Sequence, residues 1–324
     1  MAPKASRQPA GCARPTWHRI FPTMAGLPLR RALGAILVAA ALARGLTAHA
    51  GIAPEGSMVT TAPNGASERI PVTVMRPEGP GAFPAVVILH DCSGLGPRSS
   101  GAPERWSREL VARGYVVVIP DSFTTRGFPD GVCTDASRSR GQVGPARRVV
   151  DAYAALAHAR ALPFVDGRRV GVMGGSHGGS TTLAAMAAPE SEGEALARDK
   201  RAGFAGAVAL YPGCRAALGS WHADTGTYRA VAPLLILIGE KDDWTPAAPC
   251  VALARSSETT PHPVELVVYP GAHHSFDSER PVRFVATRVN MNAPGGRGAT
   301  TGGDPRAWAD SIRRVTEFFE RTLG

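Results

Sequence analysis

The chain has 324 residues, of which 44% are hydrophobic and 19% charged, and this composition supplies a folded core and excludes a disordered chain. The formal net charge is +9, yet the first 50 residues hold seven Lys and Arg and no Asp or Glu, so residues 51–324 carry 29 basic against 27 acidic side chains. A body this close to neutral argues against a nucleic-acid partner.

The first predicted element in chain order is an export signal. An apolar, alanine-rich run at 32–43 follows two arginines and is too short to span a bilayer comfortably. Small residues at the end of this region suit a signal peptidase, so we expect residues 1–50 to be a signal peptide that is cleaved after Ala50. The segment before Met24 is long for a leader, which makes Met24 an alternative start. A retained membrane anchor is the other interpretation of the run, and its shortness argues against it.

Strands and helices alternate along residues 51–324, which we expect to form a single exported domain, periplasmic or secreted, with no stable membrane span. The alternation predicts an α/β fold with a mostly parallel, twisted sheet and helices on both faces. The segment 292–304 is rich in Gly and Thr and is predicted to be a loop. Predicted strands cover 70–75, 85–90, 115–120, 169–173, 205–210, 234–238 and 264–269, and predicted helices cover 104–113, 145–161, 177–187, 247–256 and 305–323.

Four cysteines remain after cleavage of the signal, an even number in an oxidising compartment. Sequential strands are often neighbours in such a sheet, so loops that follow them meet at its carboxyl edge. On that ground we predict the disulfides Cys92–Cys133 and Cys214–Cys250. Four free buried thiols are the alternative.

A serine between glycines is the strongest catalytic signal. The segment Gly174-Gly175-Ser176-His177-Gly178 matches the pattern G-x-S-x-G. The pattern alone is weak in a chain with this much glycine, but here it lies between a predicted strand and an alanine-rich helix, the strand–turn–helix that exposes a nucleophilic serine. We interpret Ser176 as the nucleophile, with a capping serine at a helix start as the alternative. The backbone N–H of His177 is then expected to be one oxyanion donor.

A serine nucleophile needs a base and a carboxylate that orients the base. Two acids, Asp242 and Asp243, follow the predicted strand at 234–238, and two histidines, His273 and His274, follow the last predicted strand. All four lie just beyond carboxyl ends of strands, where open α/β sheets place their sites. Order and position alone leave open which acid and which histidine take part.

At these motifs the chain resembles the dienelactone hydrolase family of α/β hydrolases. The resemblance covers about 70–323 and rests on Gly-Gly-Ser-His-Gly-Gly, Gly-Glu-Lys-Asp-Asp-Trp-Thr-Pro and Gly-Ala-His-His-Ser-Phe-Asp. It implies an α/β-hydrolase fold and hydrolysis of an ester or lactone, and it selects Asp242 and His274 as acid and base. The founding enzymes of the family use cysteine where this chain has Ser176, so their own lactone substrate does not carry over.

Further site residues follow from the resemblance. The second oxyanion donor is expected to be the backbone N–H of Cys92, in the loop after the strand at 85–90. Arg126 stands near the place where the founding enzymes bind a substrate carboxylate, so it is a candidate substrate-binding residue, and a salt-bridged surface arginine is the alternative. Asp91 and Trp244 stand beside the site residues in the same motifs and are further candidates for substrate binding.

No cofactor or metal is predicted. The chain has no G-x-G-x-x-G and no lysine after a glycine, so it lacks the usual loops for dinucleotides and nucleoside phosphates. It also lacks C-x-x-C, and the adjacent His273 and His274 do not place two ligands on one side of a strand or helix.

The leading interpretation is an exported serine hydrolase that cleaves a small-molecule carboxylic ester or lactone through an acyl-enzyme. Two alternatives remain open: an exported peptidase of the prolyl-oligopeptidase type, and a non-catalytic binding protein on a hydrolase scaffold. The sequence does not indicate an oligomeric state.

Overall fold

The computed structural model describes residues 55–188, 203–215 and 228–324. Every described residue belongs to one compact unit, which lies within His49–Gly324. The predicted signal peptide, residues 1–50, lies outside the described residues. Among the helices of the described ranges, none combines the length and the apolar character that crossing a membrane requires.

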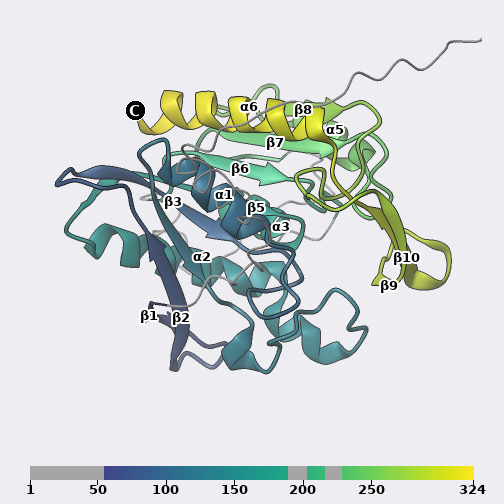
Figure 1. Ribbon diagram of the computed structural model, residues 1–324, viewed down its shortest axis with the longest axis horizontal. Helices are drawn as coiled ribbons and strands as arrows, with labels where there is room; N and C mark the ends of the chain where they lie inside the picture. The colour runs from purple at the N-terminus through teal and green to yellow at the C-terminus, as the bar shows by residue number, and fades with distance from the viewer. Residues whose placement is uncertain (1–54, 189–202, 216–227) are drawn as a thin grey trace, which may run out of the picture. The chain divides into compact units, whose positions relative to one another are not determined.

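Within the described residues, one eight-stranded sheet forms the centre of the fold, in the order β1-β2-β4-β3-β5-β6-β7-β8 (Figure 1). From β4 to β8 in this order the strands run parallel, while β1 and β2 add an antiparallel edge. The predicted mostly parallel sheet is therefore confirmed. The strands are β1 (Gly56–Thr61), β2 (Ser67–Met75), β3 (Phe83–Leu89), β4 (Val116–Pro120), β5 (Val165–Gly175), β6 (Ala207–Leu210), β7 (Leu234–Gly239) and β8 (Glu265–Tyr269).

The edge strand β1 has no counterpart among the predicted strands, which correspond to β2 through β8. It pairs only with β2, and of its residues Met58 and Thr60 alone are buried. A short edge strand with one half-buried face carries too few alternating apolar residues to be distinguished from a loop. The central strands carry a stronger signal because both of their faces are buried.

Helices cover both faces of the sheet, as predicted. α6 runs along one face and α2 lies on the other (Figure 1). α1 joins α6, where the rings of Trp106 and Trp308 meet with centroids 4.7 Å apart, and α3 packs against α2. The helices are α1 (Ala102–Val111), α2 (Pro145–Ala161), α3 (His177–Met186), α5 (Ala247–Ser256) and α6 (Pro305–Leu323), and short 3-10 helices cover Thr124–Arg126, Arg138–Val143 and Pro294–Gly296.

The amphipathic helix α6 approaches β5 closely because Gly171 has no side chain. A Cβ at that position would lie 2.8 Å from a ring carbon of Phe319 and 3.1 Å from Cδ1 of Leu323. Both side chains are buried, and full burial of a Phe or Leu contributes about 1.5–3 kcal/mol. The helix therefore anchors the strand that ends at the predicted nucleophile.

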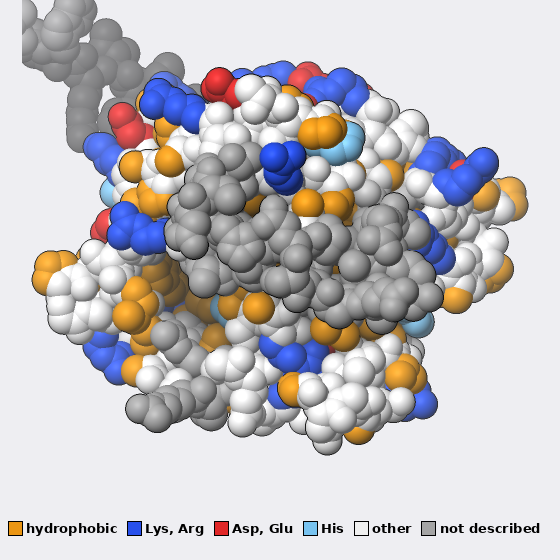
Figure 2. All heavy atoms as spheres, turned by 180° about the vertical axis from the view of Figure 1, so that it is seen from behind, with side chains coloured by type: hydrophobic (Ala, Val, Ile, Leu, Met, Phe, Trp, Pro, Cys, Tyr) orange, Lys and Arg blue, Asp and Glu red, His pale blue; other side chains and the backbone are white. Residues whose placement is uncertain are grey.

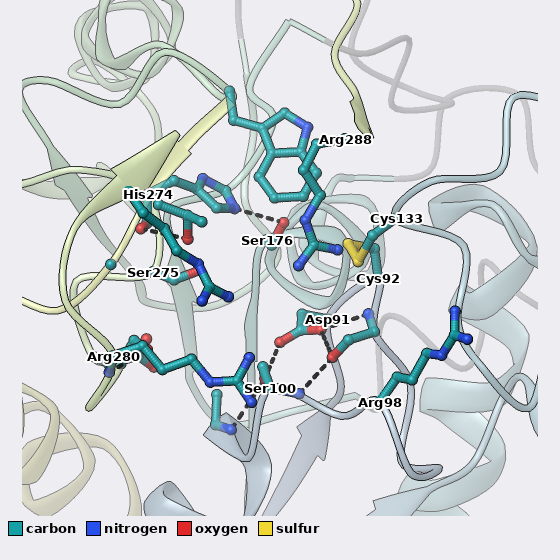
Figure 3. Close-up of a pocket in the computed structure, with 18 of the residues that line it drawn as sticks. Asp91, Cys92, Arg98, Ser100, Cys133, Ser176, His274, Ser275, Arg280 and Arg288 are labelled. Carbon is teal, nitrogen blue, oxygen red and sulfur yellow. Dashed lines mark hydrogen bonds between the residues drawn. A yellow bond between two sulfur atoms is a disulfide. The ribbon is translucent and has the colours of Figure 1, made fainter. Parts of the chain in front are cut away.

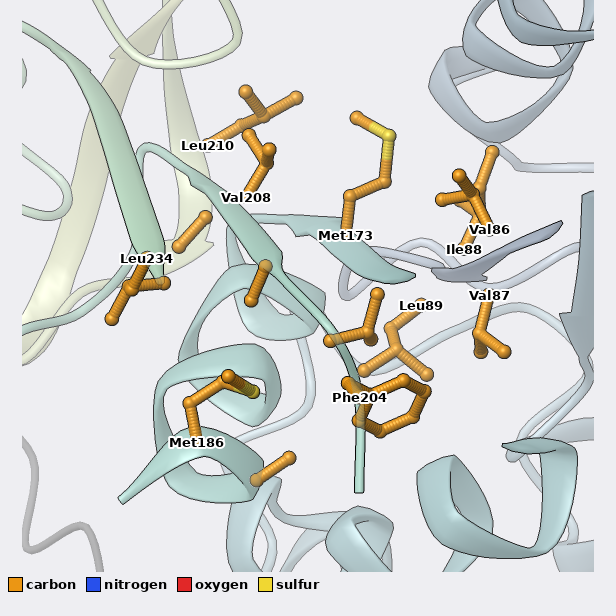
Figure 4. Close-up of a cluster of buried hydrophobic side chains, with 14 of the residues drawn as sticks. Val86, Val87, Ile88, Leu89, Met173, Met186, Phe204, Val208, Leu210 and Leu234 are labelled. Carbon is orange, nitrogen blue, oxygen red and sulfur yellow. The ribbon is translucent and has the colours of Figure 1, made fainter. Parts of the chain in front are cut away.

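The core is continuous through the sheet. The strands β4 and β7 are buried along their whole length, as a parallel sheet covered on both faces requires. Figure 4 shows the alternation along β3, with Val86 and Ile88 on one side and Val87 and Leu89 on the other. Because the strands are buried on both faces, their ends are fixed in position, and the loops at the carboxyl edge of the sheet begin from these fixed ends.

A hairpin of β9 (Arg283–Val289) and β10 (Arg297–Thr301) stands outside the main sheet (Figure 1). The prediction of a loop over 292–304 is therefore wrong in part, because β10 lies within it and pairs antiparallel with β9. Gly295 and Gly296 adopt positive φ angles of 75° and 71°, so the glycines make the turn of a hairpin. A bridge between Thr301 and His274 joins β10 to the segment after β8.

The face turned away from the view of Figure 1 carries its Lys and Arg side chains dispersed among other residues (Figure 2). Among the described side chains of this face, the basic ones form no continuous stripe. The dispersal agrees with the near balance of basic and acidic residues in 51–324.

Candidate active site

Ser176 stands at the turn between β5 and α3, with backbone angles φ 53° and ψ −113°. Non-glycine residues rarely adopt a positive φ, so this turn is strained and requires small neighbours. A Cβ on Gly178 would lie 1.9 Å from the carbonyl oxygen of Leu89, and one on Gly174 would lie 2.5 Å from the carbonyl carbon of Gly178. The glycines of the G-x-S-x-G segment therefore let the start of α3 touch the end of β3.

The hydroxyl of Ser176 begins a chain of hydrogen bonds to a histidine and an acid. Its Oγ lies 2.9 Å from Nε2 of His274 (Figure 3). Nδ1 of His274 in turn lies 2.8 Å from Oδ2 of Asp242. The three residues are 8%, 0% and 4% exposed, respectively. In this geometry the imidazole can take the hydroxyl proton at Nε2 while the carboxylate holds the proton on Nδ1.

The turn after β7 fixes the carboxylate of Asp242. Its Oδ1 accepts the backbone N–H groups of Trp244 and Thr245 at 2.9 and 2.7 Å. The hydroxyl of Thr245 lies 2.9 Å from Oδ2. An ionised carboxylate accepts several hydrogen bonds and donates none, so this set of donors orients it toward the imidazole.

The neighbouring acid and histidine have other partners. The two oxygens of Asp243 accept the backbone N–H and the hydroxyl of Thr300, each at 2.7 Å, which attaches β10 to this turn. His273 lies near the surface, with Nδ1 3.0 Å from the carbonyl oxygen of Lys241. Neither side chain joins the hydrogen-bond chain that starts at Ser176.

The segments expected to supply oxyanion donors both adjoin Ser176. His177 is the first residue of α3, so its N–H belongs to the open start of the helix. Cys92 lies three residues after β3, in a loop that lines the cleft at Ser176. The two segments therefore flank the hydroxyl from the helix side and from the strand side.

The structure contains both disulfides of the predicted pairing, and both lie at the carboxyl edge of the sheet. The Cα atoms of Cys92 and Cys133 are 5.0 Å apart, and those of Cys214 and Cys250 are 5.1 Å apart. The first pair lines the cleft, and the N–H of Val132 donates to the carbonyl oxygen of Cys92 at 2.7 Å. This disulfide therefore fixes the loop that carries one expected oxyanion donor.

An open cleft of about 610 Å³ adjoins Ser176, and arginines dominate its charged lining. Figure 3 shows Arg98, Arg280 and Arg288 around the cleft, with Arg98 on the loop before α1 and the other two near β9. Arg283 lines the cleft as well. No described carboxylate forms an ion pair with Arg280, Arg283 or Arg288, and Nε of Arg288 is buried without a hydrogen-bond partner there.

No described carboxylate of the cleft forms an ion pair with Arg280, Arg283 or Arg288; burial lowers the pKa of Arg288, and the charge of Asp91 opposes that effect. Asp91 accepts hydrogen bonds from two serines of its own loop. Asp277 accepts from Nε1 of Trp106 at 2.8 Å and from the hydroxyl of Tyr211 at 2.9 Å, and burial raises its pKa, which favours the neutral form. The lining as a whole is therefore positive and attracts anions.

A second cavity, about 860 Å³ with its open mouth, also reaches Ser176, and its lining is largely apolar. The Trp244 ring lies between the two spaces, with its centroid 4.7 Å from that of the His274 ring. Ser176 is thus reached from a basic side and from an apolar side. The apolar lining includes Val132, Pro145, Val289 and the Cys92–Cys133 disulfide.

Asp91 and Trp244 both lie at the cleft, and their polar groups are engaged within the protein. Nε1 of Trp244 donates to the carbonyl oxygen of Val289 at 2.8 Å, and Cζ of Arg288 lies over the Trp244 ring at 5.3 Å from its centre. The carboxylate of Asp91 accepts from the backbone and hydroxyl of Ser93 and from the hydroxyl of Ser100. Asp91 therefore orders the loop that follows β3.

Arg126 lies away from the cleft, and it lines neither cavity at Ser176. Its guanidinium donates to Glu68 at 2.9 and 2.7 Å and to Asp151 at 2.6 and 2.8 Å, and its side chain is only 7% exposed. Burial alone would lower the pKa of Arg126, but the hydrogen bonds to Asp151 and Glu68 outweigh burial and raise it. Substrate binding by Arg126 does not fit this position, because its donors are already used in a buried ion-pair network.

The cleft arginines near β9 are not among the site residues that the sequence predicts. Arg280, Arg283 and Arg288 lie between the last predicted strand and the predicted loop, in a segment left unassigned. A usable signal was present, because the run from Arg283 to Val289 contains two valines, a phenylalanine and a threonine, residues that favour strands. A strand directly after the His274 motif would have placed these arginines beside the base.

One group of possible metal ligands occurs in the described ranges: Asp91, Cys92 and Cys133. The two sulfur atoms are bonded to each other, so neither is a thiolate that could bind a metal. The carboxylate of Asp91 is held by serines. The group therefore serves the loop and does not form a metal site.

Comparison with known proteins gives a family and a fold. The model of the dienelactone hydrolase family matches residues 70–323, and comparison with curated proteins gives no match. A Klebsiella pneumoniae protein assigned as a dienelactone hydrolase aligns with a TM-score of 0.59 and 20% identity over 82% of this chain and 98% of its own. Thermogutta terrifontis esterase 2, phosphoramylated by tabun, aligns with a TM-score of 0.54 and 17% identity over 83% of this chain and 96% of its own. A dienelactone hydrolase-like promiscuous phosphotriesterase from metagenomic libraries aligns with a TM-score of 0.52 and 21% identity over 83% of this chain and 98% of its own.

Proposed function

Since the chain belongs to the dienelactone hydrolase family and is a hydrolase of ester bonds, we propose that it cleaves a carboxylic ester or lactone through an acyl-enzyme on Ser176. The observation that carries the proposal is the hydrogen-bond chain from Ser176 Oγ through His274 to Asp242, with distances of 2.9 and 2.8 Å. A serine, a base and an orienting acid in this geometry are the parts that acyl transfer needs.

In the first half of the reaction, Ser176 Oγ attacks the ester carbonyl carbon while Nε2 of His274 takes the hydroxyl proton. The carbonyl oxygen becomes an oxyanion, which accepts hydrogen bonds from the backbone N–H groups of Cys92 and His177. Asp242 stabilises the imidazolium. The tetrahedral intermediate then expels the alcohol oxygen, which receives the proton from His274, and the acyl group stays on Ser176.

In the second half, water attacks the acyl carbon and His274 takes the proton of the water. The second oxyanion forms at the same donors and collapses, the acid product leaves, and the proton returns to Ser176 Oγ. A lactone follows the same course, except that the alcohol released in the first half remains part of the acyl chain.

The positive cleft supports a substrate that carries an anionic group near the scissile bond. Arg280, Arg283 and Arg288 line it without a carboxylate partner among the described residues, and guanidinium groups bind carboxylates well. The apolar cavity on the other side of Ser176 suits a hydrocarbon group. The substrate class proposed is thus an ester with one acidic and one apolar side.

The cysteines support export as part of the proposal. Both disulfides are compatible with an oxidising compartment, and the apolar run at 32–43 supplies a signal peptide. Mass spectrometry of the mature protein tests this directly. A mature chain beginning at Gly51 in an extracytoplasmic fraction is expected, and an uncleaved chain in the cytoplasm would contradict it.

Labelling with a fluorophosphonate tests the mechanism. The wild-type protein is expected to gain one adduct at Ser176 and to lose turnover of p-nitrophenyl butyrate in step with labelling. Ser176→Ala is expected to take no adduct and to lower turnover by about 10³-fold or more. A labelled Ser176→Ala, or a wild type that binds esters without turning them over, would contradict the proposal, and the second result would favour a non-catalytic binding protein.

The substrate class has its own test. A p-nitrophenyl hemisuccinate, with a carboxylate, is expected to be preferred over the neutral butyrate, and salt is expected to weaken the preference. Arg288→Gln should reduce the ratio of the two kcat/KM values by about tenfold. Arg297→Gln is the matched control, because Arg297 lies on the same hairpin and does not line the cleft. An equal ratio in all three proteins would contradict the anionic preference.

A further inference from the structure

A buried arginine contacts both segments that the proposed mechanism uses to hold the oxyanion. Arg148, in the first turn of α2, is fully buried. Its NH1 atom lies 2.9 Å from the carbonyl oxygen of His90 and 2.8 Å from Nδ1 of His177. His90 precedes Cys92 by two residues, and His177 itself carries the other donor. One nitrogen atom therefore joins the loop after β3 to the start of α3.

The direction of these hydrogen bonds follows from the guanidinium, which donates and cannot accept. Nδ1 of His177 must therefore be the acceptor, so this ring is neutral and carries its proton on Nε2. Burial and the charge of Arg148 lower the pKa of His90 well below its ordinary value, and its Nε2 accepts the backbone N–H of Ser122 at 3.2 Å. Arg148 is thus the cation of a cluster whose imidazoles are neutral.

Aromatic rings enclose the guanidinium. Cζ of Arg148 lies 5.1 Å from the ring centre of Phe123, within cation–π distance. The same ring meets His90 edge to face at 4.4 Å and His177 at 5.6 Å. The two histidines and the arginine are therefore packed around one buried phenylalanine, which leaves the guanidinium little freedom to leave its two acceptors.

Stability of the fold does not account for this arrangement. Burial lowers the pKa of Arg148 to about 10, so the residue is still charged at neutral pH. Within the described residues, its Nε and NH2 have no hydrogen-bond partner. A buried cation with unmet donors is destabilising relative to an apolar side chain of similar size. A role at the adjoining site explains why such a residue occupies the first turn of α2.

We propose that Arg148 is a positioning residue that sets the spacing between the two oxyanion donors, and this role rests on the acyl-transfer function proposed above. Arg148 lines neither cavity at Ser176, so it acts through the backbone that it holds. Oxyanion donors work at about 2.7–3.1 Å from the developing charge, and loss of one donor lowers turnover by about 10²–10³-fold. A small drift between the loop after β3 and the start of α3 is therefore enough to slow the reaction.

The test compares Arg148→Met with Arg147→Met. Arg147 is its neighbour in the same turn, but it pairs with Glu68 and Asp151 and lines neither cavity at Ser176. Both variants are titrated with a fluorophosphonate, so that kcat is expressed per reactive Ser176. For Arg148→Met we expect kcat to fall by about 10²-fold with KM changed by less than about threefold, and for Arg147→Met we expect no change in either.

A second measurement distinguishes a positioning role of Arg148 from a general loss of structure in the variant. A trifluoromethyl ketone forms a tetrahedral oxyanion adduct with a serine nucleophile, so its inhibition constant reports the oxyanion donors. In Arg148→Met the constant is expected to rise by the same factor as kcat falls. Values of kcat and of the inhibition constant within about threefold of wild type would overturn the positioning role.

The histidine partner supplies a pair of variants that leaves the arginine in place. His177→Leu removes the acceptor, whereas His177→Asn offers its amide oxygen where Nδ1 stood. We expect kcat of the Asn variant to exceed that of the Leu variant by at least about tenfold, and equal values would overturn the role even if Arg148→Met fails to fold. A wild type without ester turnover would overturn the proposed function and this inference together, whereas an active wild type beside an unaffected Arg148→Met overturns this inference alone.

Discussion

Asp243 accepts both the backbone N–H and the hydroxyl of Thr300, each at 2.7 Å. The residue before it, Asp242, contacts the imidazole of His274 at 2.8 Å. Two adjacent acids on one turn therefore face two different structures: one contacts the proposed base, and the other holds the hairpin whose arginines line the cleft. The turn after β7 therefore holds both the imidazole of His274 and the hairpin that forms one wall of the cleft.

The two acids should give different kinetic defects. In Asp242→Asn the amide cannot hold the proton of the imidazole in place, so kcat is expected to fall by about 10³–10⁴-fold. In Asp243→Asn the hairpin loosens, so KM for an acidic ester is expected to rise about threefold to tenfold with a much smaller change in kcat. Steady-state kinetics on the hemisuccinate ester check both. Similar losses of kcat in the two variants would contradict the division of roles.

Arg126 should matter for folding and not for substrate. Arg126→Met leaves the fully buried Asp151 without its main partner, and breaking such a pair is destabilising by about 3–5 kcal/mol, near the lower end here because Arg147 remains close. Chemical unfolding is expected to show that loss at unchanged kcat and KM for the acidic ester. A raised KM at unchanged stability would instead return Arg126 to the substrate site.

The same network predicts how stability depends on pH. For Asp151, burial would raise the pKa, but the hydrogen bonds and charge of Arg126 outweigh burial and lower it; for Glu68, the hydrogen bond from Arg126 lowers the pKa. Carboxyls with a lowered pKa stabilise the fold above their unfolded values of about 3.9 and 4.3, and this contribution is lost as the pH falls through the folded values.

Unfolding in urea at pH 7 and pH 3 measures this contribution. The wild type is expected to lose more stability between the two pH values than Arg126→Met, which lacks the interaction at both. Equal losses in the two proteins would show that the network does not contribute to the acid response.

The two disulfides should be separable by their effect on turnover. They close loops of similar size, with sequence separations of 41 and 36, so each is expected to contribute about 3–4 kcal/mol in the chain-entropy model. Replacing Cys92 and Cys133 by serine is expected to lower both stability and kcat, because the backbone N–H of Cys92 is a proposed oxyanion donor. Replacing Cys214 and Cys250 is the matched control and should lower stability with a smaller effect on kcat. Equal kcat losses would contradict the special role of the first pair.

Local patterns predicted the parts of the fold that local forces determine. Continuous apolar runs such as 85–90 and 234–238 indicate buried strands, and the alternation of such runs with helices predicts the parallel sheet. The serine turn is predictable for the same reason, since Gly174 and Gly178 are needed wherever a strand ends against the start of a helix in this way. The family resemblance then chose Asp242 and His274, the pair that the structure brings to Ser176.

Arg148 and Arg126 show where prediction from sequence stops. Both are arginines, and arginine is a residue type that is mostly exposed at the surface. Their burial is decided by partners far away in sequence: Phe123 and His177 for the first, Glu68 and Asp151 for the second. No periodicity in the first turn of α2 or in the loop after β4 encodes such partners.

The separation of the β9–β10 hairpin from the central sheet has a consequence for how this molecule can change. The proposed nucleophile, base and acid stand on loops after β5, β8 and β7, inside a framework that tolerates little alteration. The hairpin contributes no strand to that framework, so the charges that it presents to the cleft can be exchanged, provided that Thr300 and Thr301 keep their contacts with Asp243 and His274. Engineers who graft other hairpins that keep these two threonines would thereby combine a new recognition surface with unaltered positions of the proposed catalytic residues.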